Sequence, residues 1–278
     1  MPKKLAVAVI HGIGAQGVSQ PPDSAVPSFS KELHKRVRRE VGSGQFDQDI
    51  SWREIFWADI LQTRQDRYLS AIKRRTRYDD MRKFVFQNLG DASAYQKTAD
   101  PVDNTYEKIH KRAEKTIRQL DQDTEDGAPM VILAHSLGGH IISNYIYDTQ
   151  KPPATPNRSF RELRTVAALV TFGCNLPLFT LSYAPERIFP IRFPGTDLPP
   201  EKRLKPWWYN YYDKDDVLGY PLKDIGPRYA AMVERGEMKE VSINAGTLFT
   251  AWNPMSHNGY WRDDDFYRPV AKLLKKLV

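Results

Sequence analysis

A strand-like run that leads into a serine constrains this chain more than any other feature. The apolar stretch Met130–Ala134 precedes Ser136 by one residue, and a helix is predicted to begin at Leu137. Continuous apolar runs of this length are typical of buried parallel strands. A sharp strand-to-helix turn lifts a serine hydroxyl clear of the backbone and tolerates only small residues two positions either side. Ala134 and Gly138 occupy those positions, so Ser136 is a candidate nucleophile.

Apolar segments alternate with helical patterns along the rest of the chain. Strands are predicted at residues 4–10, 50–60, 130–134, 166–172, 207–212 and 240–243. Helices are predicted at residues 28–41, 61–89, 106–120, 137–147 and 262–277. This alternation predicts a mostly parallel sheet of about six strands with helices on both faces.

Length and composition indicate one ordinary globular domain. The chain has 278 residues, of which 41% are hydrophobic and 27% charged, and no linker divides it, so we expect residues 1–278 to form a single domain. No apolar run approaches the roughly 18 residues that span a membrane. The single cysteine, Cys174, excludes an internal disulfide and a multi-cysteine zinc site, and it fits a reducing, cytoplasmic compartment.

The net charge of +7 has two interpretations. The basic residues within 61–89 lie where hydrolases accept helical insertions, so residues 61–100 form a candidate lid or a patch for anionic membrane lipid. The alternative, more common for such charge runs, is a solvated helical face. No nucleic-acid-binding module and no metal-binding motif occurs in the sequence, so neither nucleic acid nor a metal is expected as a partner.

The segment around Ser136 also resembles a known family. Ala-His-Ser-Leu-Gly-Gly, residues 134–139, is similar to the nucleophile elbow of lipases and esterases of the α/β-hydrolase superfamily. The resemblance implies a three-layer α/β-hydrolase fold and a lipase-like serine esterase that requires no cofactor. It implies a triad in the chain order serine, acid, histidine, and an oxyanion hole to which the N–H of Leu137 contributes.

That order identifies the remaining triad members. Of six histidines, only His257 follows Ser136 by more than a few residues, and it lies between the last predicted strand and the last predicted helix. Its His-x-x-Tyr-Trp segment resembles the C-terminal segments of relatives. The acid is expected just after the strand at 207–212, with Asp216 as first choice, Asp215 as close second and Asp213 less favoured.

An early glycine loop is the expected source of the second oxyanion donor. The first strand ends in His11-Gly12-Ile13, and the backbone N–H of Ile13 or a neighbour such as Gly12 is expected to face the oxyanion, with His11 in a structural role. Gly12-x-Gly14-x-x-Gly17 also matches a dinucleotide-binding fingerprint, but three prolines follow where that fingerprint requires a helix. A nicotinamide enzyme is therefore a minor alternative.

The sequence thus predicts a serine hydrolase that cleaves a small-molecule or lipid ester through an acyl-enzyme. Thioesters and amides would use the same apparatus, so the bond type stays open. The alternative is a non-catalytic member of the fold that binds a ligand or a protein. The sequence gives no indication of oligomeric state.

Overall fold

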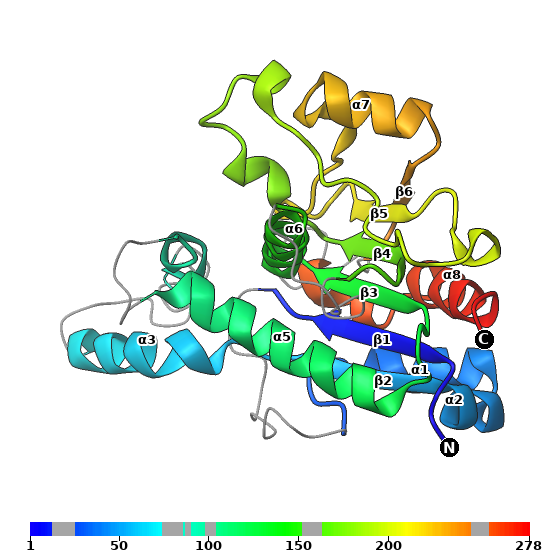
Figure 1. The fold of residues 1–278 in the computed structure, drawn as a ribbon. Coiled ribbons are helices and arrows are strands. Elements are labelled where there is room, and N and C mark those ends of the chain that lie inside the picture. The colour runs from blue at the N-terminus through cyan, green and yellow to red at the C-terminus, as the bar shows by residue number, and fades with distance from the viewer. Residues whose placement is uncertain (13–25, 74–85, 87–89, 98–103, 152–162, 246–255) are drawn as a thin grey trace.

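The computed structural model describes residues 1–12, 26–73, 86, 90–97, 104–151, 163–245 and 256–278. A six-stranded sheet runs through this part of the chain in the order β2-β1-β3-β4-β5-β6, and every neighbouring pair is parallel (Figure 1). The strands are β1 (Leu5–Ile10), β2 (Ile50–Ile55), β3 (Met130–His135), β4 (Val166–Phe172), β5 (Trp208–Asp213) and β6 (Met238–Ile243). The predicted sheet of about six strands is confirmed, and it is wholly parallel.

Helices cover both faces of the sheet. One face carries α5 (Thr105–Asp123), α6 (Leu137–Thr149) and α7 (Pro227–Glu234), and the other carries α1 (Lys31–Val41), α2 (Ser43–Asp49) and α8 (Asp264–Lys275). Helix α3 (Asp59–Ile72) extends away from the sheet as an arm (Figure 1). Five short 3-10 helices complete the described elements, η2 (Leu176–Phe179), η3 (Pro185–Arg187), η4 (Pro200–Lys202), η5 (Lys223–Ile225) and η6 (Ser256–Trp261).

The three layers follow from the two-residue period of the strands. Along β1 the side chains of Ala6 and Ala8 enter the core beneath α5 and α6, whereas those of Leu5 and Val7 enter the core beneath α1 and α8. All residues of β1 are fully buried. A strand buried on both faces needs a continuous apolar run, which explains why the sequence shows runs rather than alternation.

The predicted elements differ from the observed ones mainly at their ends. The predicted strand at 50–60 stops at Ile55, and the predicted helix at 28–41 begins only at Lys31. Two short helices, α2 and α7, were not predicted, because seven or eight residues give too little helical period to recognise. None of the described helices is both long and apolar enough to cross a bilayer.

The strand order positions the site. From β1 the chain goes first to β2 on one side and then to β3 on the other, so the order reverses between β1 and β3. In open parallel sheets, ligands bind outside the carboxyl ends of the strands at such a switch point. The loops that follow β1 and β3 carry Gly12 and Ser136.

Candidate active site

Ser136 occupies a strained turn between β3 and α6. Its backbone has φ 53° and ψ −125°, and among the described non-glycine residues only Ser136 and Leu163 have a positive φ. The turn is held by hydrogen bonds from the Ser136 N–H to the Phe172 carbonyl (3.0 Å) and from the Gly139 N–H to the Ser136 carbonyl (2.9 Å). Such a conformation costs about 1–3 kcal/mol and persists where the surrounding structure enforces it. This geometry is what a nucleophile elbow requires.

The loop after β1 lies directly against Ser136, the candidate nucleophile. A Cβ atom on Gly12 would stand 2.4 Å from Ser136 Cβ and 3.0 Å from Ser136 Oγ, so only glycine fits there. The N–H of Leu137 belongs to the first turn of α6, where the helix itself offers no acceptor. Gly12 and Leu137 thus both adjoin Ser136, as the prediction of an oxyanion hole requires. Ile13 lies outside the described residues, so its role stays a prediction.

His11 is structural, as expected. Its Nε2 accepts a hydrogen bond from the Trp57 N–H (3.1 Å), its Nδ1–H donates to the Gly12 carbonyl (2.7 Å), and its ring stacks on the Trp57 indole. Burial lowers the pKa of His11 to about 4, so the imidazole is neutral at pH 7. These bonds fix the orientation of the Gly12 carbonyl beside the nucleophile.

Asp216 and His257 form a buried pair. His257 Nδ1 lies 2.8 and 3.0 Å from the two carboxylate oxygens of Asp216, whose side chain is 1% exposed. The Tyr260 hydroxyl and the Leu218 N–H, each at 3.0 Å, also donate to this carboxylate. Burial alone would raise the pKa of Asp216, but the bond and charge of His257 and these two donors lower it below its ordinary value. Asp216 is therefore an anion that orients an imidazole.

The neighbouring aspartates take other roles. Asp215 is exposed, and its N–H donates to Asp213 Oδ1 at 2.9 Å. Asp213 is buried and accepts the Ala245 N–H at 2.8 Å, which ties β5 to the chain after β6. Of the three aspartates that the sequence offered, the structure brings Asp216 to His257, and the alternative Asp215 points elsewhere.

His257 is oriented as a catalytic base would be, but it makes no hydrogen bond with Ser136, the candidate nucleophile. Because Nδ1–H donates to Asp216, Nε2 is the unprotonated nitrogen of the neutral ring. This Nε2 is buried and has no hydrogen-bond partner within the described part of the chain, Ser136 Oγ included. Catalytic hydrogen bonds are often long in unliganded enzymes and tighten when substrate binds.

Two supporting residues were not identified from the sequence. The Tyr260 hydroxyl donates to the Asp216 carboxylate at 3.0 Å and accepts a hydrogen bond from the Asp213 N–H at 2.8 Å. Gly173, after β4, has φ +56°, and a Cβ there would lie 3.0 Å from His257 Cε1. The spacing His-x-x-Tyr was visible in the sequence as a signal for Tyr260, whereas nothing in the sequence pairs Gly173 with His257.

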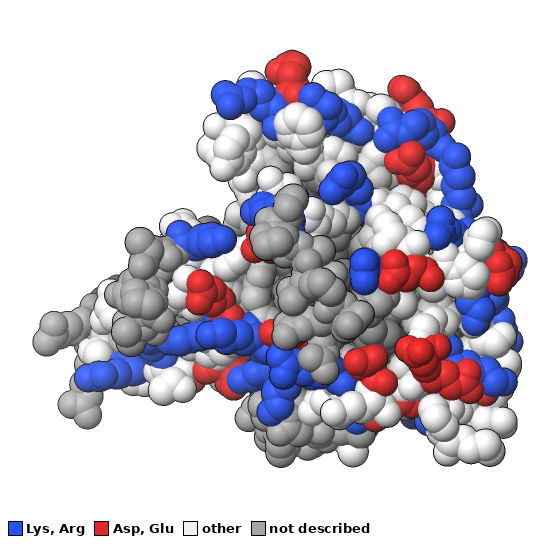
Figure 2. Space-filling view, in the orientation of Figure 1, with Lys and Arg blue, Asp and Glu red and all other residues white. Residues whose placement is uncertain are grey.

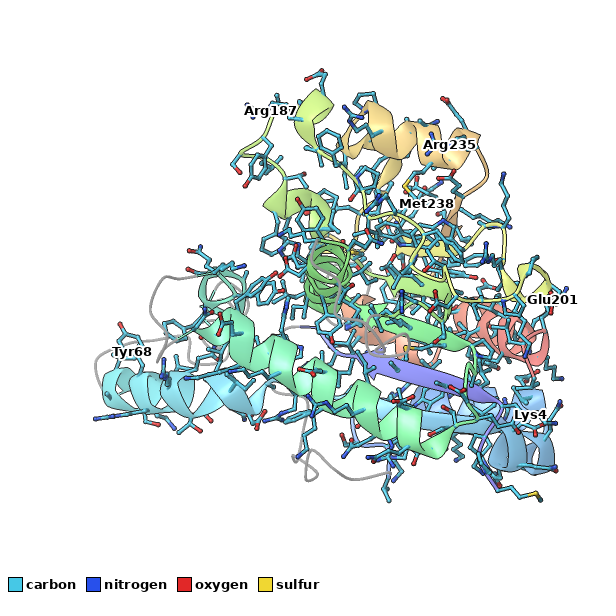
Figure 3. The ribbon with its side chains drawn as sticks, viewed as in Figure 1. Lys4, Tyr68, Arg187, Glu201, Arg235 and Met238 are labelled. Atoms are coloured by element: carbon cyan, nitrogen blue, oxygen red, sulfur yellow. The ribbon has the colours of Figure 1, made fainter. Side chains whose placement is uncertain are left out.

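The basic arm shows mixed charge. Figure 2 shows Lys and Arg side chains along α3 and α5 with acidic residues between them. Some of these are paired, such as Arg112 with Asp59 and Arg118 with Glu114. Tyr68 lies toward the far end of α3 (Figure 3) and stacks on Phe86. Much of the predicted lid at 61–100 lies outside the described residues, so a lid or membrane role stays a prediction.

Other nucleophile and metal chemistry finds no support among the described residues. Burial raises the pKa of the Cys174 thiol to about 12, which keeps it protonated at pH 7. Within the described ranges no group of three or more His, Cys, Asp or Glu side chains is arranged to hold a metal ion. Gly14 and Gly17 of the dinucleotide fingerprint are not among the described residues.

Comparison with models of known protein families gives no match, and comparison with curated proteins gives none either.

Proposed function

We propose that this chain is a serine hydrolase of the α/β-hydrolase type, which cleaves a carboxylic ester through an acyl-enzyme. The observation that carries the proposal is the buried Asp216–His257 pair beside a serine in a strained turn. These three groups come from the loops after β5, β6 and β3, at the carboxyl edge of one parallel sheet. A structural serine N-cap would not need a positive φ, and the unpaired Nε2 of His257 is free to accept the proton of a nucleophile.

The first step is formation of the acyl-enzyme. His257 Nε2 accepts the proton from Ser136 Oγ as that oxygen attacks the ester carbonyl carbon, and Asp216 stabilises the imidazolium that forms. The carbonyl π electrons move to oxygen, and the N–H of Leu137 stabilises this oxyanion together with a donor from the loop at Gly12. Collapse of the intermediate breaks the bond to the alcohol oxygen, which takes the proton from His257. Water then repeats the sequence and releases the acid.

The surroundings of the triad favour an ester with an apolar part. Val217, next to the triad acid, is 72% exposed, and Leu181 and Tyr183 in the segment between η2 and η3 are 80% and 64% exposed. Large exposed apolar side chains favour contact with apolar ligands or lipid. A lipid ester is therefore the substrate class that we propose.

A fluorophosphonate probe tests the proposal. Its phosphorus is attacked by a serine oxygen with loss of fluoride, which needs an activating base and an oxyanion site. We expect intact-mass analysis to show one adduct on the wild type and none on Ser136→Ala. Ser143→Ala is the matched control, because Ser143 is buried in the same helix away from the turn, and it should label like the wild type.

The unformed bond between Ser136 and His257 favours one competing function, a non-catalytic ligand-binding module. An unlabelled wild type, both in buffer and with mixed detergent micelles, would contradict the hydrolase and support that module. A labelled wild type would be followed by p-nitrophenyl esters of graded chain length. The proposed apolar substrate predicts that kcat/KM rises from acetate toward longer acyl chains.

A further inference from the structure

His135 is a buried imidazole that neither the triad nor the oxyanion hole uses. It is the last residue of β3 and the chain neighbour of Ser136, and it is 1% exposed. Its Nε2 lies 2.8 Å from the backbone carbonyl oxygen of His257. A carbonyl oxygen can only accept, so Nε2 carries the proton and donates it, and Nδ1 is the unprotonated nitrogen. The bond joins the nucleophile's neighbour to the backbone of the base.

The ring of His135 is held on several sides. Its centroid lies 4.6 Å from that of His257, 5.0 Å from that of Phe172 and 5.2 Å from that of Trp261. On another side, a Cβ on Gly12 would stand 3.2 Å from His135 Nδ1. His135 therefore contacts the base and the loop after β1 while it is covalently linked to the nucleophile.

Two contacts then set the position of His257. The Asp216 carboxylate binds the imidazole at Nδ1, and His135 binds the backbone carbonyl of the same residue. The first contact alone would fix the tautomer but would leave the ring free to move together with its backbone. The second ties that backbone to β3, one residue before Ser136.

We infer that His135 is a positioning residue, whose Nε2–H holds the backbone of His257 at a set distance from Ser136. The inference rests on the proposed hydrolase function, because positioning matters only if His257 acts as the base. It requires a neutral imidazole, since a cation beside the ring would oppose the imidazolium that forms on His257. Burial, followed by the charge of His257, lowers the pKa of His135 well below its ordinary value, although its bond to the His257 carbonyl and the Asp216 charge oppose this.

Two substitutions distinguish the effect of the Nε2–H donor of His135 from the effect of its side-chain volume. His135→Gln keeps an N–H₂ donor at about the reach of Nε2, whereas His135→Met keeps a long side chain without a donor. His34→Gln is the matched control, because His34 lies on α1 and packs against Phe46 and Trp52. Each variant is compared with the wild type for melting temperature, for the rate of fluorophosphonate labelling, and for kcat and KM with p-nitrophenyl butyrate.

We expect His135→Met to lower kcat by about 100-fold with little change in KM, because a misplaced base affects the chemical step and not substrate binding. His135→Gln should restore most of that loss, and His34→Gln should behave as the wild type. A folded His135→Met variant with wild-type kcat would overturn the inference. So would equal losses in the Met and Gln variants, since the donor would then not matter.

A measurement on the resting protein separates this inference from the proposed function. Imidazole ¹⁵N–¹H NMR of the wild type should show His135 as a neutral Nε2–H tautomer from about pH 5 to about pH 8. This range brackets the ordinary histidine pKa of about 6.5. If the wild type is never labelled by the probe but this signal is present, the hydrolase proposal fails while the tie between His135 and His257 stands. If His135 is an Nδ1–H tautomer or titrates in this range, the tie itself is wrong.

Discussion

Asp215 and Asp216 are neighbours in sequence with opposite environments. Asp215 is exposed, while Asp216 is buried and accepts hydrogen bonds from His257, Tyr260 and Leu218. A carboxylate can stay charged in such a site only because these donors offset the cost of burial. Substitutions at these two neighbouring residues therefore give a matched test of which aspartate is the proposed triad acid.

We expect Asp216→Asn to lower kcat by about 10⁴-fold, because the amide cannot stabilise the imidazolium and favours the wrong tautomer of His257. Asp215→Asn should leave kcat close to the wild-type value. Steady-state rates with p-nitrophenyl butyrate would measure both. Similar losses in the two variants would mean that Asp216 is not the triad acid.

A second test concerns the contact between Gly12 and Ser136. A methyl group at residue 12 would stand 2.4 Å from Ser136 Cβ, so the nucleophile or the loop must move. We expect Gly12→Ala to slow fluorophosphonate labelling by at least about 100-fold, since small displacements of reacting groups cost that much.

Gly44→Ala is the control for that substitution. Gly44 lies within α2, and nothing stands within 4 Å of its added Cβ. Alanine should raise the free energy of unfolding by up to about 1 kcal/mol through its higher helix propensity and leave labelling unchanged. If Gly12→Ala labelled as fast as Gly44→Ala, Gly12 would not adjoin the reacting oxygen.

At this scale the sequence pointed to the three residues of the proposed triad and missed the residues that support them. Ser136 and His257 follow from a local motif and from chain order, which a sequence displays directly, and Asp216 was the first choice among three neighbouring aspartates. The contact of Gly173 with His257 joins residues 84 positions apart, by their numbering, through the packing of loops after β4 and β6. No local pattern reports such a contact, because it depends on which strands are neighbours in the sheet.

At the scale of elements, the interface of α5 with α6 carries two partly buried histidines. His110 on α5 accepts the Tyr95 hydroxyl at 2.7 Å, and His140 on α6 stacks on Phe179. Burial lowers the pKa of each to about 4. Both are therefore neutral in the folded protein over a range in which an unfolded chain binds protons.

This predicts a loss of stability in mild acid. Between the unfolded pKa of about 6.5 and the folded pKa of about 4, the unfolded state binds more protons, so the free energy of unfolding falls as pH falls. Each histidine contributes up to about 1.4 kcal/mol per pH unit. Urea unfolding measured in steps from about pH 7 to about pH 4.5 covers this window. The plot of the free energy of unfolding against pH should have a shallower slope for His110→Gln than for the wild type. An unchanged slope would contradict the assignment of His110 as a neutral group with a lowered pKa.

The order and type of the elements were predictable, and several of their ends were not. The strand β4 was predicted with its observed bounds, because Val166–Phe172 is apolar throughout and is buried on both faces. The helix predicted from residue 28 starts at Lys31, since Ser28 and Ser30 instead donate to the Glu54 carboxylate of β2. That tertiary contact competes with the helix, and the local sequence gives no sign of it.

At the scale of the whole molecule, the sheet imposes the geometry that Ser136 would not adopt alone. The Ser136 N–H donates a hydrogen bond to the Phe172 carbonyl at the end of β4, and the Ser136 side chain packs closely against Gly12 in the loop after β1. Strain of this kind, about 1–3 kcal/mol, is offset by the stability of the rest of the fold. The strand order that places the candidate site at the switch point therefore also supplies the contacts that hold Ser136 in this conformation.

The strain predicts opposite responses to glycine at two serines of the same region. At residue 136 the φ of 53° disfavours any side chain, so Ser136→Gly should be about 1 kcal/mol more stable than Ser136→Ala, although both lack the nucleophile. At Ser143, within α6, helix propensity makes glycine about 1 kcal/mol less stable than alanine. Urea unfolding of the four variants would measure both differences. If glycine were the less stable substitution at both positions, the turn at Ser136 would hold no strain, and the structural argument for an elbow would lose its main support.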